Sequence, residues 1–106
     1  MNENAAKTYK VLLEAGCQPR TSKAIGQATG LTDIQIRVAV RELREVHRLK
    51  ICSGREGFWI WNGSDDSWSH TKNQIRSRYN SLRRLYTAME FSPDPDQVRL
   101  EIGDRE

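Results

Sequence analysis

The sequence lacks the features that mark disulfide-rich secreted proteins and membrane proteins. It has only two cysteines, Cys17 and Cys52, which lie far apart and fit free thiols in a reducing cytosol. No apolar run reaches the roughly 18 residues that a membrane span needs, and no basic-then-apolar segment opens the chain. We therefore expect no membrane partner, no signal peptide and a cytoplasmic location.

Residue constellations that carry catalysis are also missing. His47 and His70 are isolated, and neither has metal-ligand spacing to a cysteine. Asp65 and Asp66 lie side by side in a polar stretch, not facing each other across a cleft. No serine has the sequence context of a nucleophile elbow, and no glycine-rich loop has phosphate-binding spacing. We expect a protein that is not an enzyme and that holds neither a metal nor a cofactor.

What the chain does have is a segregated charge. Its 106 residues are enough for one domain with an appendage, and they carry a formal net charge of only +3. Counted by segment, residues 21–50 carry +3 and residues 71–90 carry +4, whereas residues 51–70 carry −2 and residues 91–106 carry −3. Two basic segments are thus offset by acidic ones, and the placement of the charge is more informative than its sum.

Apolar periodicity predicts a first helix over residues 5–15. Asn4 is the expected N-cap, and Gly16 stands where a left-handed residue ends many helices. The apolar side of this helix comprises Ala5, Tyr9, Leu12 and Leu13.

Two further helices are predicted before residue 50. One begins at Thr21 or Ser22 and runs to about Thr29, where Gly30 ends it. The next runs from Thr32 or Asp33 to about His47. Its apolar stripe, at spacings of three and four, comprises Ile36, Ala39, Val40, Leu43 and Val46.

Beyond residue 48 the apolar period changes from helical to alternating, which predicts a hairpin with its tip at residues 53–57. Phe58 and Ile60 point to one face, and Trp59 and Trp61 point to the other. The tryptophan face must be covered by another element or remain an exposed aromatic patch.

A long helix is predicted from Ser69 or Thr71 to about Phe91. Its apolar residues follow a heptad seam in which Lys72 occupies one a position. Either this seam pairs with its copy in a dimer, or it packs back on the preceding domain and covers the two tryptophans. The residues assigned to dimerisation are Ile75, Tyr79, Leu82, Tyr86 and Met89.

The segment from Ser22 to Leu43 resembles the helix-turn-helix motif of DNA-binding proteins. Gly26 is the small residue that the motif needs where its two helices cross, and Gly30 is the glycine of its turn. Leu31 and Ile36 match its apolar positions, and the predicted hairpin matches the wing of winged helix-turn-helix proteins. The whole chain is similar in layout to small phage- and prophage-encoded proteins of that kind with a basic C-terminal helix.

This resemblance implies a mainly α fold with a small β-hairpin: three helices plus a wing, followed by an additional long C-terminal helix. The implied layout is a winged helix-turn-helix domain at residues 1–62, a linker at 63–70, the C-terminal helix at 71–91 and an acidic flexible tail at 92–106. The acidic tail is a departure from the family's layout.

The resemblance also implies sequence-specific binding of double-stranded DNA, with the third helix in a major groove and the wing near the backbone or minor groove. A dimer is favoured because two-fold symmetry suits palindromic sites. The implied role is a phage transcriptional regulator, or a protein that marks a replication or packaging site on DNA in the bacterial cytoplasm. The implied DNA-binding residues are Thr21, Ser22, Lys23, Thr32, Asp33, Gln35, Arg37, Val38, Arg41, Arg44 and Arg55.

Each of these assignments has a plainer alternative. Arg37 and Arg41 are also what a solvated helix face carries, and Asp33 is equally suited to a helix cap. Ile34 and Val38 suit a thymine methyl group or a protein contact equally well. The alternative function is therefore a winged-helix module that binds a protein partner and reads no DNA.

Overall fold

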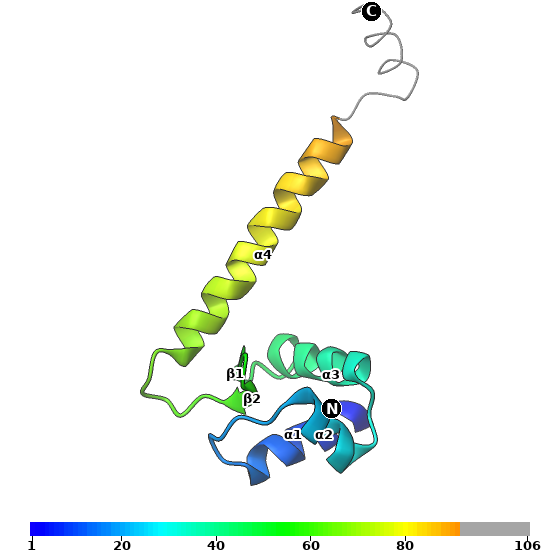
Figure 1. Cartoon of the computed structure of the whole chain (residues 1–106), viewed down its shortest axis with the longest axis vertical. Helices are drawn as coiled ribbons and strands as arrows, with labels where there is room; N and C mark the ends of the chain where they lie inside the picture. The colour runs from blue at the N-terminus through cyan, green and yellow to red at the C-terminus, as the bar shows by residue number, and fades with distance from the viewer. Residues whose placement is uncertain (92–106) are drawn as a thin grey trace, which may run out of the picture. The chain divides into compact units, whose positions relative to one another are not determined.

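The computed structural model describes residues 1–91, which are mainly helical with one two-stranded antiparallel hairpin among them (Figure 1). This confirms the expected class. The predicted acidic tail, residues 92–106, lies outside the described residues. The chain divides into two compact units, Met1–Asn73 and the residues from Gln74 onward. The elements are α1 (Glu3–Glu14), α2 (Ser22–Thr29), α3 (Asp33–Glu45), β1 (Ile51–Gly54), β2 (Gly57–Ile60) and α4 (Ser67–Glu90).

Helix α1 begins earlier than its apolar pattern indicates. Its N-cap is Asn2, whose side chain accepts the amide of Ala5 at 2.8 Å, so the assignment of Asn4 is wrong. Leu13 was expected on the apolar side but is exposed, whereas Thr8 is buried in its place. The buried side of α1 therefore includes Thr8 and excludes Leu13. The apolar pattern could not predict this, because the residue at position 8 is polar.

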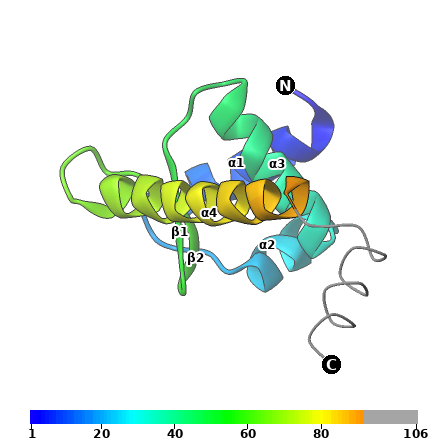
Figure 2. The same ribbon diagram turned by 90° about the horizontal axis from the view of Figure 1, so that it is seen from above.

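Helices α2 and α3 lie next to each other in the N-terminal unit (Figure 2). Both follow their local sequence signals. Thr21 and Thr32 are the N-caps, and Gly30 ends α2 in the left-handed region at φ 78°. At Gly26 a Cβ atom would lie 3.0 Å from the carbonyl oxygen of Leu31, so glycine lets α2 approach the segment that follows it.

The core of the N-terminal unit forms where α1, α2 and α3 meet one side of the hairpin. The predicted stripe of α3 is buried over most of its length, but Val46 is 66% exposed and does not belong to it. Val46 is the C-cap residue, where the helix already ends. The buried hydrophobic cluster comprises Ala5, Leu12, Ile25, Ile36, Ala39, Val40, Leu43 and Ile51.

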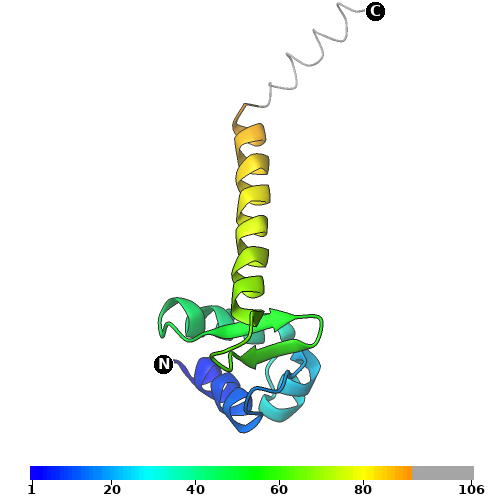
Figure 3. The same ribbon diagram turned by 90° about the vertical axis from the view of Figure 1, so that its left-hand side faces the viewer.

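The hairpin pairs Ile51 with Ile60 and Cys52 with Trp59, and Arg55 and Glu56 form its two-residue turn (Figure 3). Because strand side chains alternate, Ile51 enters the core while Cys52 points to the opposite face. The sequence pattern had already assigned the faces of β2 in this way.

A contact that the sequence pattern did not predict joins the hairpin to the start of α2. Arg20 and Phe58 exchange two backbone hydrogen bonds of 2.8 Å, so the residues before α2 form a bridge along the free edge of β2. The backbones come so close that a Cβ atom at Gly57 would lie 2.1 Å from the carbonyl oxygen of Arg20. This bridge fixes the hairpin against the beginning of α2.

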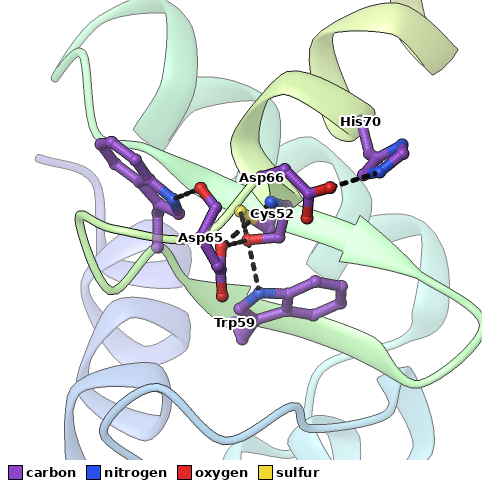
Figure 4. Close-up of polar contacts among 7 residues, drawn as sticks. Cys52, Trp59, Asp65, Asp66 and His70 are labelled. Atoms are coloured by element: carbon purple, nitrogen blue, oxygen red, sulfur yellow. Dashed lines mark hydrogen bonds and ion pairs between the residues drawn. The ribbon is translucent and has the colours of Figure 1, made fainter.

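Helix α4 begins at Ser67, inside the segment predicted as a linker. Its first turns close the outer face of the hairpin: Thr71 is buried, and its hydroxyl accepts the amide of Ser53 at 3.1 Å. The hydroxyl of Ser67 lies 3.3 Å from the Cys52 sulfur and 3.4 Å from Nε1 of Trp59 (Figure 4). The tryptophan face is therefore half-buried against the beginning of α4.

Asp65 organises the turn that leads into α4. Its carboxylate accepts the hydroxyl and the amide of Ser67 at 2.6 and 3.0 Å, and its carbonyl accepts Nε1 of Trp61 at 3.0 Å. The hydroxyl bond is the largest cause that lowers the pKa of Asp65, and the amide bond adds to it. Asp66 instead pairs with His70 one turn into α4, at 3.1 Å (Figure 4).

Candidate nucleic-acid interface

The exposed side of α3 is the most distinctive surface of the N-terminal unit. The helix starts at a capping box in which Thr32 and Gln35 exchange side-chain to backbone hydrogen bonds of 2.9 and 3.2 Å. In the first two turns of the helix, Ile34 is 74% exposed and Val38 is 59% exposed. Two β-branched apolar side chains one turn apart thus face the solvent.

The two arginines on this side are each held by an acid on the same helix. Nε of Arg37 donates to Asp33 at 2.9 Å, and Nε of Arg41 donates to Glu45 at 2.8 Å. Exposed pairs of this kind contribute only about 0–1 kcal/mol to stability. In the structure each pair turns Nε of the guanidinium group toward the acid.

Asp33 also joins α3 to α2, because the hydroxyl of Ser22 donates to its carboxylate. This bond, followed by the one from Arg37, lowers the pKa of Asp33. The start of α2 and the start of α3 are therefore neighbours, as the predicted interface requires.

The hydroxyl groups predicted at the start of α2 already have partners within the fold. Thr21 caps α2 by accepting the amide of Ala24 at 3.1 Å, and Ser22 bonds to Asp33. Lys23 is exposed beside them. Arg20, which is not among the predicted contacts, is exposed one residue before this cap. No periodic signal marks Arg20, since its position follows from the backbone bridge to Phe58.

Arg44 has a different place from the other predicted contacts. Its Nε donates to the carbonyl of Ile51 at 2.9 Å, and a terminal nitrogen donates to the hydroxyl of Ser53 at 3.1 Å. These partly buried bonds tie α3 to β1. Arg44 therefore has a structural position between α3 and β1.

Arg55 lies at the exposed turn of the hairpin. Two residues later, Gly57 contacts the backbone of Arg20 and Thr21. The end of the hairpin that carries Arg55 is thus anchored through Gly57 to the residues just before α2.

The second unit contains most of α4. Every side chain from Gln74 to Phe91 is exposed, including all five residues assigned to dimerisation. These five recur at spacings of three and four, and together with Leu85 they are 44–65% exposed. The helix also carries Arg76, Arg78, Arg83 and Arg84.

Comparison of the chain with protein-family models, with curated proteins and with solved structures finds no match. Within residues 1–91, none of the helices has the length and apolarity needed to cross a membrane. The same residues contain no group of three or more histidine, cysteine or acidic side chains placed to hold a metal ion.

Proposed function

We propose that this protein is a winged helix-turn-helix protein that binds double-stranded DNA in a sequence-specific way. In this proposal α2 and α3 are the two helices of the motif, and the hairpin of β1 and β2 is the wing. Residues near the start of α2 and at the hairpin turn contact phosphates, while the exposed side of α3 contacts base edges.

The observation that carries the proposal is the bridge between Arg20 and Phe58. A short strand between the first two helices that pairs with the hairpin is what makes a wing rigid with respect to the helix-turn-helix. Here the bridge holds the wing beside α2, and the bond from Ser22 to Asp33 holds α2 beside α3. The three predicted contact regions are thereby connected through the fold.

Charge supports a division of labour within this interface. Arg37 and Arg41 are offset by their acidic partners, so the exposed side of α3 contributes little net charge. Arg20, Lys23 and Arg55 are exposed cations around it. Attraction to phosphate then comes mainly from the rim, and discrimination comes from α3.

We further propose that the protein acts as a homodimer through the apolar side of α4, and that it serves as a regulator of transcription or as a marker of a replication or packaging site. The apolar residues of α4 are exposed in the single chain at coiled-coil spacing. Two-fold pairing would present two copies of α3 to a palindromic site.

The test is a salt titration of duplex binding by the wild-type chain and by the double variant Arg37→Ala, Arg41→Ala. We expect affinity for the preferred duplex to fall steeply with salt, and the double variant to lose most of its preference. The control is Lys7→Ala, Lys10→Ala on α1, which removes the same formal charge outside the interface. Equal binding by the wild-type chain and the Arg37, Arg41 variant would refute the proposal.

The second candidate is a module that binds a protein partner, favoured by the exposure of Ile34 and Val38. That function requires no affinity for DNA, and its binding would depend only weakly on salt. Absence of salt-dependent binding to any duplex, even from a random pool, would favour this candidate.

A further inference from the structure

The exposed side of α3 combines two kinds of groups in a fixed pattern. Arg37 and Arg41 are each bound to a carboxylate through Nε, and Ile34 and Val38 expose apolar groups alongside them. At about 100° per residue, Ile34 and Arg41 share the middle of this side, with Arg37 on one flank and Val38 on the other. The arginines and the apolar pair therefore face outward together.

Binding through Nε determines which part of each guanidinium remains for a ligand. The contacts of Arg37 and Arg41 within residues 1–91 use Nε, which leaves the two terminal nitrogens of each group as a fork. Such a fork matches O6 and N7 of guanine, which is the commonest specific arginine contact in the major groove. Favouring this orientation beforehand lowers the entropy lost when the fork binds.

The acids that hold the arginines also act against unselective binding. Asp33 and Glu45 are exposed on the same side of α3, so they repel phosphates that approach it. A correctly placed guanine offsets this repulsion by accepting two hydrogen bonds from an arginine. A wrong base forms no such bonds, so the repulsion of the phosphates is not offset. The two acids are thus positioning residues that favour specificity over affinity.

The apolar pair has one natural counterpart in the major groove. The C5-methyl group of thymine is the apolar contact that a base edge presents there. Ile34 and Val38 lie one turn apart, so a single groove segment that faces the arginines would be within reach of both.

Resting on the proposed function, we infer that α3 recognises guanine next to thymine: Arg37 and Arg41 bind guanine, Asp33 and Glu45 position them, and Ile34 and Val38 contact thymine methyl groups. This names the sequence class of the DNA that the interface takes. It also assigns a role to Asp33 and Glu45. An interface that bound DNA by charge attraction alone would have no use for acidic residues there.

The first test measures binding of the full chain to its preferred duplex, selected from a random pool, and to a scrambled duplex of the same composition. The variants are Asp33→Asn and Glu45→Gln, and the control is Glu14→Gln, which removes a carboxylate from the exposed end of α1. We expect each α3 variant to bind the scrambled duplex more tightly while its preference falls about tenfold. The control should keep the wild-type preference. If an α3 variant gains affinity for both duplexes by the same factor, the positioning role is overturned.

The main arm of the second test changes only the DNA, so its result with the wild-type chain does not depend on any variant folding. Replacing thymine by uracil removes the methyl group alone, and replacing guanine by 7-deazaguanine removes N7 alone. We expect either change in the preferred duplex to weaken wild-type binding by about fivefold or more. We expect Ile34→Ala with Val38→Ala to abolish the effect of uracil.

The outcomes separate this inference from the function on which it rests. A wild-type chain that binds a preferred duplex but tolerates both base replacements retains the proposed function and overturns the guanine–thymine inference. A wild-type chain that binds no duplex overturns both.

Discussion

The backbone amide of Ser53 donates to the hydroxyl of Thr71 over 3.1 Å, and this bond joins β1 to the second turn of α4. Thr71 is 1% exposed, although every other described residue from Ser69 onward is exposed. The first turns of α4 therefore belong to the N-terminal unit and are not a separate appendage.

Replacing Thr71 by valine is expected to lower the free energy of unfolding by about 1–3 kcal/mol, because it leaves the amide of Ser53 without its acceptor. Thr8 is the matched control, since it is equally buried but its hydroxyl has no hydrogen-bond partner within residues 1–91. Thr8→Val should therefore be neutral or stabilising. Urea denaturation of both variants measures the difference, and equal effects would show that the Ser53 bond contributes nothing.

Replacing Gly57 by alanine is expected to destabilise the domain by more than about 2 kcal/mol. The new Cβ atom would overlap the carbonyl of Arg20, and φ at this position is +114°. Gly16→Ala is the control, because φ there is also positive but no atom lies within 4 Å of the added Cβ. That variant should lose only about 1 kcal/mol. Thermal unfolding followed by circular dichroism compares the two, and a Gly57 variant as stable as the Gly16 variant would contradict the bridge.

Acid pH is expected to remove the contribution of Asp65. Its pKa is lowered in the folded chain, so its stabilisation is present above the ordinary carboxyl pKa of about 4 and is lost as the pH falls through the lower folded value. Asp65→Asn should therefore be less stable than wild type at pH 7, and the gap should close toward pH 2. Glu56→Gln, in the exposed hairpin turn, is the control. A gap that is constant across this range would contradict the role given to the carboxylate.

Charge on the apolar side of α4 is expected to prevent dimerisation. Leu82→Lys places a cation within the predicted seam, whereas Ser77→Lys adds the same charge about half a turn away from it. Sedimentation should give a monomer for the first variant and a dimer for the second. Because residues 74–90 carry four arginines and only Glu90, added salt should strengthen the wild-type dimer while it weakens DNA binding. A wild-type monomer at all salt concentrations would remove the dimer proposal.

Local signals predicted much of this fold. Thr21 and Thr32 were expected near the helix starts, Gly30 at the helix end, and the hairpin faces follow the alternation of Phe58 and Trp59. Each of these features depends on residues within a few positions of one another, so a single sequence contains the whole signal.

The features that the sequence did not reveal depend on residues far apart in the chain. The bridge from Arg20 to Phe58 has no periodicity, and the burial of Thr71 is decided by β1 and not by its own helix. That Arg44 contacts DNA stays a prediction. Its hydrogen bonds to β1 could not be predicted, because its partners lie on another element. Exposed pairs such as Arg37 with Asp33 were implicit in the spacing, yet only the structure shows that they use Nε.

The bridge also sets an order on folding. Arg20 and Phe58 are separated by nearly forty residues, so the contact that secures α2 closes a long loop at an entropic cost before its bonds form. Among the elements that form the core of the N-terminal unit, β2 is synthesised last. A chain interrupted after α3 lacks this strand and the bridge, so we expect it to be a better substrate for proteases than the full chain.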